Sequence, residues 1–274
     1  MAAKLTAQTA DREIVLLLPG MSFNASIFPD FDLTTIAPDF NELALGRDGG
    51  AASDGRMEVY RRLLDDFLAG EPAWATGRRI VVGHSFGGML ALDWLLTHGG
   101  KGIGRIDGLL LIATTAGRMF DVARLRLGAL GGRERRLPLK HLMPIWNLKL
   151  VTRAVKRFTS GGSLAARRVD FSSLVDRSDL ALDLAGWRNT DWRAMRSYRI
   201  AMRGFDVRDR LGDIRVPSIV LHGTEDRLFP LAVARELAGR LPQAELRVVP
   251  GAAHGLPLTH GSEVQRALRD LSAT

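Results

Sequence analysis

Cysteine is absent from this chain of 274 residues. Its absence excludes disulfides, a thiolate nucleophile and cysteine-ligated metals, and it fits a reducing compartment. Long apolar runs are also missing near the N-terminus, because the first run, residues 14–18, ends after five residues at Pro19 and Gly20. A signal peptide or a membrane span needs a longer apolar stretch. We therefore expect a soluble, cytoplasmic protein.

Acidic residues are scarce in one part of the chain. Residues 118–204 hold 19 basic side chains and only 7 acidic ones, a net charge of +12, whereas the whole chain carries +8. The other residues therefore carry a net charge of −4. The sequence thus predicts a mildly acidic body with a strongly basic insert. Such a run of charge is most simply a solvated surface, and a docking surface for an acidic partner is the alternative.

One stretch combines a strand, a sharp turn and a helix. Residues 80–82 are apolar and β-branched, the pentapeptide GHSFG follows at 83–87, and apolar residues recur with helical spacing from Met89. A serine at such a break, here Ser85, is the layout of a nucleophile elbow. The pattern G-x-S-x-G alone would arise by chance in about one such chain in seven, so its weight comes from this setting. The alternative is a glycine-rich turn whose serine caps the helix.

Apolar runs and helical patterns alternate along most of the chain. Strands are expected over 13–18, 33–37, 80–82, 106–113, 214–221 and 245–249, and helices over 57–69, 89–98, 230–241 and 261–271. This alternation predicts an α/β fold with a mainly parallel sheet that helices cover on both faces. Ligands of such sheets bind beyond the carboxyl ends of the strands, and Ser85 lies at one of those ends.

A serine nucleophile needs a base, and the base needs a carboxylate that orients it. Among the six histidines, His254 follows the last expected strand in a loop of small residues, and His260 is its rival six residues later. Asp226 follows the strand that ends at Leu221, and Glu225 is the neighbouring alternative. A turn or helix-capping role is the simpler interpretation of an aspartate at such a place.

Hydrogen-bond donors are needed where negative charge develops on the substrate. The backbone N–H of Phe86 can supply one, because it follows the serine at the start of a helix. The second is expected from the loop after the first strand, where the N–H of Met21 follows Gly20. An ordinary loop is the alternative at this place. No metal or organic cofactor is predicted.

These motifs, in the order serine, aspartate, histidine, resemble the α/β-hydrolase superfamily. The segments GHSFGG at 83–88, GTED at 223–226 and GAAH at 251–254 carry the resemblance. It covers residues 13–117 and 206–272. The resemblance implies catalytic roles for Ser85, Asp226 and His254, and oxyanion-hole roles for the backbone N–H groups of Met21 and Phe86.

The sequence departs from the family pattern in two ways. The twelve residues before the first expected strand leave no room for the antiparallel hairpin with which the family usually begins. About six strands are therefore expected instead of eight. In addition, Pro19 and Gly20 stand where the family usually has His-Gly in the oxyanion loop.

The resemblance also predicts an inserted helical cap after the strand that ends at Ala113. The expected division is a core over 1–117, a basic helical cap over 118–205 with helices at 148–158 and 192–202, and a second part of the core over 206–274. Candidate substrate- or partner-binding residues of the cap are Arg124, Arg126, Arg135, Arg136, Trp146, Arg153 and Arg157. An acyl carrier protein would suit this surface as an acidic partner. Nucleic acid is disfavoured, because the basic residues lack interleaved aromatic side chains.

The sequence therefore predicts a serine hydrolase that cleaves a carboxylic ester or thioester through an acyl-serine intermediate. Its substrate is expected to be anionic or bound to an acidic carrier protein. A carbon–carbon bond hydrolase of the same fold is the nearest alternative. A hydrolase-like receptor or ligand-binding protein with little turnover is the alternative from another class, because the fold does not determine the reaction.

Overall fold

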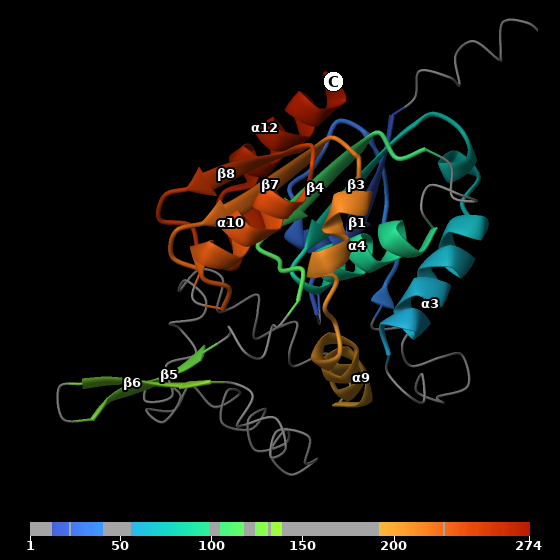
Figure 1. The fold of residues 1–274 in the computed structure, drawn as a ribbon. Coiled ribbons are helices and arrows are strands. Elements are labelled where there is room, and N and C mark those ends of the chain that lie inside the picture. Colours follow the sequence, from blue (N-terminus) through green and yellow to red (C-terminus); the bar gives the residue numbers. More distant parts are fainter. Residues whose placement is uncertain are drawn as a thin grey trace, which may run out of the picture.

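The computed structural model describes residues 13–21, 23–40, 56–98, 105–117, 124–130, 133–138, 192–226 and 228–274. Six strands form one sheet in the order β2-β1-β3-β4-β7-β8 (Figure 1). Their bounds are β1 Glu13–Leu18, β2 Thr34–Ile36, β3 Arg78–His84, β4 Gly108–Ile112, β7 Ser218–Gly223 and β8 Ala244–Val249. Each pairing within this sheet is parallel. The six-stranded parallel sheet expected from the sequence is confirmed.

Helices cover both faces of the sheet (Figure 1). Those on one face are α3 (Met57–Ala69), α4 (Phe86–His98) and α10 (Leu231–Arg240), and those on the other are α11 (Leu256–Thr259) and α12 (Gly261–Ser272). Alternate strand residues therefore enter two separate apolar cores: on β1, Leu16 packs with α3 and α4, whereas Val15 packs with α12. Each such burial stabilises the fold by roughly 1.5–3 kcal/mol.

The expected elements are found with small shifts in their bounds. Helix α3 has the expected bounds, although its N-cap is Arg56, whose side chain makes no capping hydrogen bond. Strand β7 begins at Ser218 and not at Ile214, because Pro217 has no N–H to donate to a neighbouring strand and Arg208–Asp213 form a 3-10 helix. The four-residue helix α11 was not expected. No helix within the described ranges is both long and apolar enough to cross a bilayer.

The basic insert is described only in part. Helix α9 (Trp192–Arg203) agrees with the helix expected over 192–202. Strands β5 (Arg124–Leu130) and β6 (Arg133–Pro138) form an antiparallel pair that the sequence did not predict. The missed signal is the alternation of arginine and leucine over 124–127, which has the period of two that strands favour. The expected helix over 148–158 lies outside the described residues.

The chain that precedes residue 118 and the chain that follows residue 205, called here the returning chain, lie side by side. Gly117 and Asp206 form an antiparallel bridge, and the N–H of Val207 donates to the carbonyl oxygen of Ala116 over 2.8 Å. The guanidinium of Arg208 donates to both carboxylate oxygens of Asp206 over 2.8 and 2.7 Å. The returning chain is therefore fixed to residues 116 and 117.

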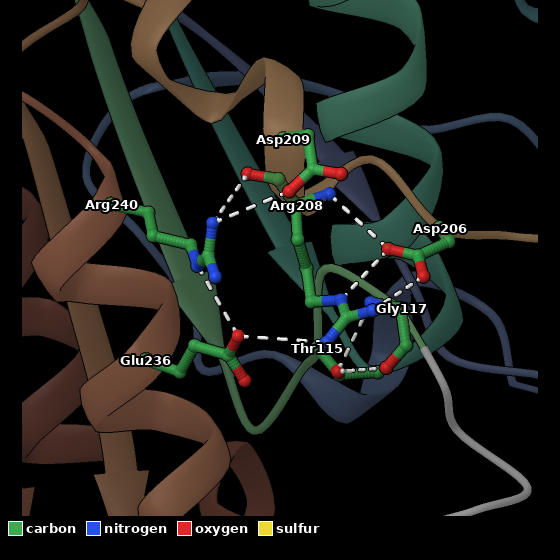
Figure 2. A network of polar contacts seen from close by, with 7 residues as sticks. All are labelled: Thr115, Gly117, Asp206, Arg208, Asp209, Glu236 and Arg240. Carbon is green, nitrogen blue, oxygen red and sulfur yellow. Dashed lines mark hydrogen bonds and ion pairs between the residues drawn. The ribbon is translucent and has the colours of Figure 1, made fainter.

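The same arginine connects this junction to helix α10. Figure 2 shows Arg208 beside Glu236, with 3.6 Å between guanidinium and carboxylate. Arg240 lies 3.2 Å from Glu236 and 3.5 Å from Asp209, so it closes the network from the other side. Both Glu236 and Arg240 belong to α10. The ion pairs thus join the returning chain to a helix of the core.

Candidate active site

Ser85 occupies the turn between β3 and α4 in a backbone conformation that L-residues rarely adopt, with φ of 51°. Hydrogen bonds to strand β4 and to the residues that follow β4 hold this turn. The N–H of Ser85 donates to the carbonyl oxygen of Ile112 over 3.0 Å, and the hydroxyl of Thr114 donates to the carbonyl oxygen of Ser85 over 2.6 Å. Such strain persists only where surrounding contacts fix it, and it presents the serine side chain at the edge of the sheet.

The glycines around this serine are required by close backbone contacts. A Cβ atom on Gly87 would overlap the carbonyl oxygen of Leu18 at the end of β1. A Cβ atom on Gly83 would lie 2.7 Å from the Cα atom of Gly88. Glycine is thus the residue that lets β1, β3 and α4 approach one another here. The elbow indicated by the sequence is confirmed as a strand–turn–helix with these contacts.

The structure brings together the three side chains that the sequence singled out. The hydroxyl of Ser85 lies 3.0 Å from Nε2 of His254, and Nδ1 of His254 lies 2.9 Å from Oδ2 of Asp226. An ionised carboxylate only accepts hydrogen bonds, so Nδ1 carries the proton and Nε2 is free to accept from the serine. Ser85 is half-buried, and the side chain of Asp226 is fully buried. The geometry allows a proton to pass from serine to histidine.

Asp226 is held ionised by its surroundings. Burial by itself would raise the pKa of its carboxyl group, but His254 and the N–H of Phe229 hold that pKa below its ordinary value of 3.8. Oδ1 accepts from the N–H groups of Leu228 and Phe229 over 2.9 and 2.8 Å. The carboxylate is therefore fixed on one oxygen by backbone donors and presents the other to the histidine.

A second histidine lies beneath this carboxylate. His222, at the end of β7, is completely buried, and its Nε2 donates to the carbonyl oxygen of Phe229 over 2.8 Å. The same nitrogen lies 3.7 Å from Oδ2 of Asp226. Burial lowers the pKa of His222, so it remains a neutral donor. His222 thus holds the loop that follows β7 by a local hydrogen bond.

The two backbone positions expected to donate to an oxyanion lie on two segments, the start of α4 and the loop after β1. Phe86 begins α4, and the first N–H groups of a helix have no acceptor within it. Met21 is half-buried in the turn after β1. Its neighbour Gly20 approaches the elbow so closely that a Cβ atom there would lie 3.3 Å from the Cβ atom of Ser85. The loop after β1 therefore borders the serine through Gly20, and the donor role of Met21 stays a prediction.

The rival residues lie elsewhere. Glu225 is exposed and donates its N–H to the carbonyl oxygen of Ala252. His260 precedes α12, and its Nδ1 lies 2.8 Å from the hydroxyl of Thr259.

Of the basic candidates, Arg124, Arg126, Arg135 and Arg136 fall on the β5–β6 pair, whose register places Arg126 opposite Arg136. Trp146, Arg153 and Arg157 lie outside the described residues.

Some contacts of this site were not expected from the sequence. Thr114 has no role in the sequence prediction, yet its hydroxyl donates to the carbonyl oxygen of Ser85. Its place directly after β4, beside the elbow strand, is the signal that pointed to it. The N–H groups of Leu228 and Phe229 carry no signal in residue type, because any residue except proline offers a backbone donor.

A parallel sheet with a serine at a strand–helix turn, and with an aspartate and a histidine after two later strands, defines an α/β-hydrolase fold. The chain belongs to the alpha/beta hydrolase family, whose family model matches residues 15–267. The superfamily that the sequence motifs resemble is thereby confirmed.

The chain is similar to several known proteins, over different shares of their length. "Putative carbamate hydrolase RutD" of Variovorax paradoxus is 26% identical over 274 aligned residues, which cover 96% of this chain and 93% of that protein. "Putative non-heme chloroperoxidase" of Synechocystis is 38% identical over 64 residues, so the match spans less than a quarter of that relative, 23%. A lipase-esterase related protein from Clostridium acetobutylicum has a solved structure with a TM-score of 0.68, 16% identity and 96% coverage of both chains. This last likeness concerns the fold alone.

Proposed function

We propose that this protein hydrolyses a carboxylic ester or thioester through an acyl-serine intermediate. One observation carries the proposal: the imidazole of His254 lies within hydrogen-bond distance of both the hydroxyl of Ser85, at 3.0 Å, and the carboxylate of Asp226, at 2.9 Å. A serine activated in this way attacks acyl carbon atoms. No metal or organic cofactor takes part in the steps proposed.

The reaction follows from the direction of these hydrogen bonds. Oγ of Ser85 forms a bond to the acyl carbon while its proton passes to Nε2 of His254. The tetrahedral intermediate then breaks its bond to the alcohol or thiol, which leaves with the proton from His254. Water repeats the sequence on the acyl-serine, gives its proton to His254 and releases the acid as the proton returns to Ser85. Asp226 stabilises the imidazolium that forms in each half of the reaction.

The negative oxygen of the tetrahedral intermediate is stabilised by two backbone donors in this proposal. They are the N–H group of Phe86, the residue after the nucleophile, and the N–H group of Met21, in the loop after β1. The position of Phe86 at the start of α4 and the close approach of Gly20 to Ser85 support this assignment. Loss of one such donor typically costs about 3–4 kcal/mol of transition-state stabilisation.

The choice of an acyl substrate is supported by the name of one relative. That protein, matched over 93% of its length, is named a putative carbamate hydrolase, and a carbamate is also attacked at a carbonyl carbon with a heteroatom leaving group. A carbon–carbon bond hydrolase uses the same three side chains on a different substrate and remains the enzymatic alternative. A receptor that binds a ligand with little turnover is the alternative outside enzymes.

The basic insert gives this proposal a partner. We propose that its arginines dock an acidic acyl carrier protein, whose acyl arm then reaches Ser85. The net charge of +12 over residues 118–204 supports this, and two of the arginines, Arg135 and Arg136, lie on β6. The double variant Arg135→Glu, Arg136→Glu should slow turnover of an acyl-carrier substrate and spare a small ester. Equal loss on both substrates would rule out a docking role.

A fluorophosphonate probe separates the enzyme from the receptor. The wild-type protein should gain one phosphonyl group on Ser85, and Ser85→Ala should gain none. An unlabelled wild type, or equal labelling of the variant, would exclude the serine-hydrolase function. p-Nitrophenyl esters of different chain length then report how long an acyl group the site accepts.

A further inference from the structure

A histidine that the proposed mechanism does not use lies directly against the mechanism's base. His84 is the last residue of β3, next to Ser85 in the chain, and only 3% of it is exposed. Its Nε2 lies 3.0 Å from the backbone carbonyl oxygen of His254. The two imidazole rings are 5.1 Å apart between centroids and tilted by 46°. The side chain of His84 therefore contacts both the backbone carbonyl and the imidazole ring of His254.

The direction of this hydrogen bond is fixed by chemistry. A carbonyl oxygen only accepts, so Nε2 of His84 must carry the proton and donate. Burial lowers the pKa of His84 to about 3, with a smaller contribution in the same direction from His254, against the opposing effects of that hydrogen bond and of Asp226. His84 is therefore neutral near pH 7, with its single proton on Nε2. Its Nδ1 is buried and has no hydrogen-bond partner among the described residues.

The ring of His84 fills the space between two loops that serve the proposed reaction. On one side Gly20 approaches so closely that a Cβ atom there would lie 2.9 Å from Nδ1 of His84. On the other side is the loop of residues 250–255, which carries His254. That loop is tied at its start, where the N–H of Gly251 donates to the hydroxyl of Thr224 over 2.9 Å. The bond from His84 ties the loop at the base itself.

We propose that His84 is a positioning residue whose Nε2–H holds the backbone of His254 so that its imidazole reaches the hydroxyl of Ser85. The inference rests on the proposed function, in which His254 is the base. A buried histidine that served only as packing would need no hydrogen-bond donor. Here the single N–H group of the His84 ring donates to the backbone carbonyl oxygen of His254, the proposed base. A misplacement of the base by about 1 Å is enough to cost roughly 100-fold in rate.

Two variants separate the donor from the bulk of the side chain. The amide of His84→Gln can place an N–H near the position of Nε2, whereas His84→Leu keeps an apolar side chain without a donor. On a small p-nitrophenyl ester we expect His84→Leu to lower kcat by about 10- to 100-fold with KM within about twofold. His84→Gln should recover most of that loss. His98→Leu, which removes a histidine paired with Asp65 at the far end of α4, is the matched control and should leave kcat unchanged.

Nuclear magnetic resonance of isotope-labelled histidine tests the contact without turnover. In the wild type His84 should be the neutral Nε2–H tautomer throughout the neutral pH range, and the ring signals of His254 should shift in His84→Leu but much less in His84→Gln. An Nδ1–H tautomer of His84 in the wild type would overturn the proposal even if no variant folds. Equal kcat losses in folded His84→Gln and His84→Leu, or wild-type kcat in His84→Leu, would also overturn it. If the signals behave as expected but fluorophosphonate leaves Ser85 unlabelled, the proposed function fails and the contact between the two histidines stands.

Discussion

Asp226 and His254 meet through a 2.9 Å contact between Oδ2 and Nδ1, although they follow two different strands, β7 and β8. These strands are parallel neighbours, paired from Ser218 with Ala244 to Gly223 with Val249. Because both strands run in the same direction, their following loops emerge at the same edge of the sheet, where β3 also presents its serine. The topology of the sheet thus aligns the carboxylate of Asp226 with the imidazole of His254.

The first prediction concerns this contact. Asp226→Asn keeps the acceptor for the N–H groups of Leu228 and Phe229 but offers His254 an amide in place of a carboxylate. The histidine then adopts the wrong tautomer, so kcat should fall by about 10⁴-fold, the size of the loss known for the same change in a serine protease. Steady-state kinetics with a p-nitrophenyl ester measure it. A loss below about tenfold would mean that Asp226 does not orient the base.

The second prediction concerns stability in mild acid. The unfolded chain protonates His84 as the pH falls through about 6.5, whereas burial lowers the pKa in the folded protein to about 3. Stability that is fully present above pH 6.5 is therefore lost progressively down to pH 3, by up to roughly 1.4 kcal/mol per pH unit. Urea unfolding at several pH values across this window measures the loss.

The variant His84→Gln should flatten that pH dependence. A part of the slope should persist, because burial lowers the pKa of His222 in the same direction. Asp226 acts in a different window, since its pKa lies below 3.8 and its contribution is lost only as the pH falls below that value. An unchanged slope in His84→Gln would show that His84 is not held neutral by the fold.

The third prediction compares two glycines. Gly87→Ala puts a Cβ atom into the carbonyl oxygen of Leu18, so it should lower the free energy of unfolding by about 3 kcal/mol or prevent folding. Gly239, in α10, has open space within 4 Å of its Cβ position. Gly239→Ala should therefore raise the free energy of unfolding by about 0.5–1 kcal/mol, because alanine favours the helix. Chemical unfolding of both variants checks the contrast, which equal stabilities would refute.

The fourth prediction concerns the junction with the insert. Arg208→Gln removes the guanidinium that bonds Asp206 and faces Glu236 (Figure 2). Since Asp206 and Glu236 are both partly exposed, solvent screens these pairs and the loss should be about 1 kcal/mol of unfolding free energy. Arg235→Gln, on the exposed side of α10, is the control and should change stability by less than about 0.5 kcal/mol. Similar losses in both variants would show that the network does not fix the returning chain.

Much of the fold could be predicted because local patterns and packing agree. The bounds of α3 were predicted to the residue, because Tyr60, Leu64 and Leu68 recur on one face and are buried there. The start of strand β7 was predicted four residues too early, because the apolar pattern continues through Pro217, which has no N–H group to donate to a neighbouring strand. The β5–β6 pair was missed because the family resemblance favoured helices throughout the insert.

The three polar side chains of the site could be predicted from their residue types and their places after strands. The contact of His84 with His254 could not, because it joins residues 170 positions apart and ends on a backbone carbonyl. Any residue offers such a carbonyl, so the partner is chosen by the course of the backbone and not by the side chain. The docking role of the arginines on β5 and β6 stays a prediction.

The most direct test of the account is to trap the acyl-serine itself. Rapid mixing with excess p-nitrophenyl ester, followed by acid quench and mass spectrometry, should show one acyl group on the peptide that contains Ser85. The same experiment should show a burst of p-nitrophenolate close to one equivalent per protein, if release of the acid limits turnover. Ser85→Ala should show neither signal. Turnover of the ester by Ser85→Ala at the wild-type rate, or an acyl group on another residue, would contradict the central claim that Ser85 is the nucleophile.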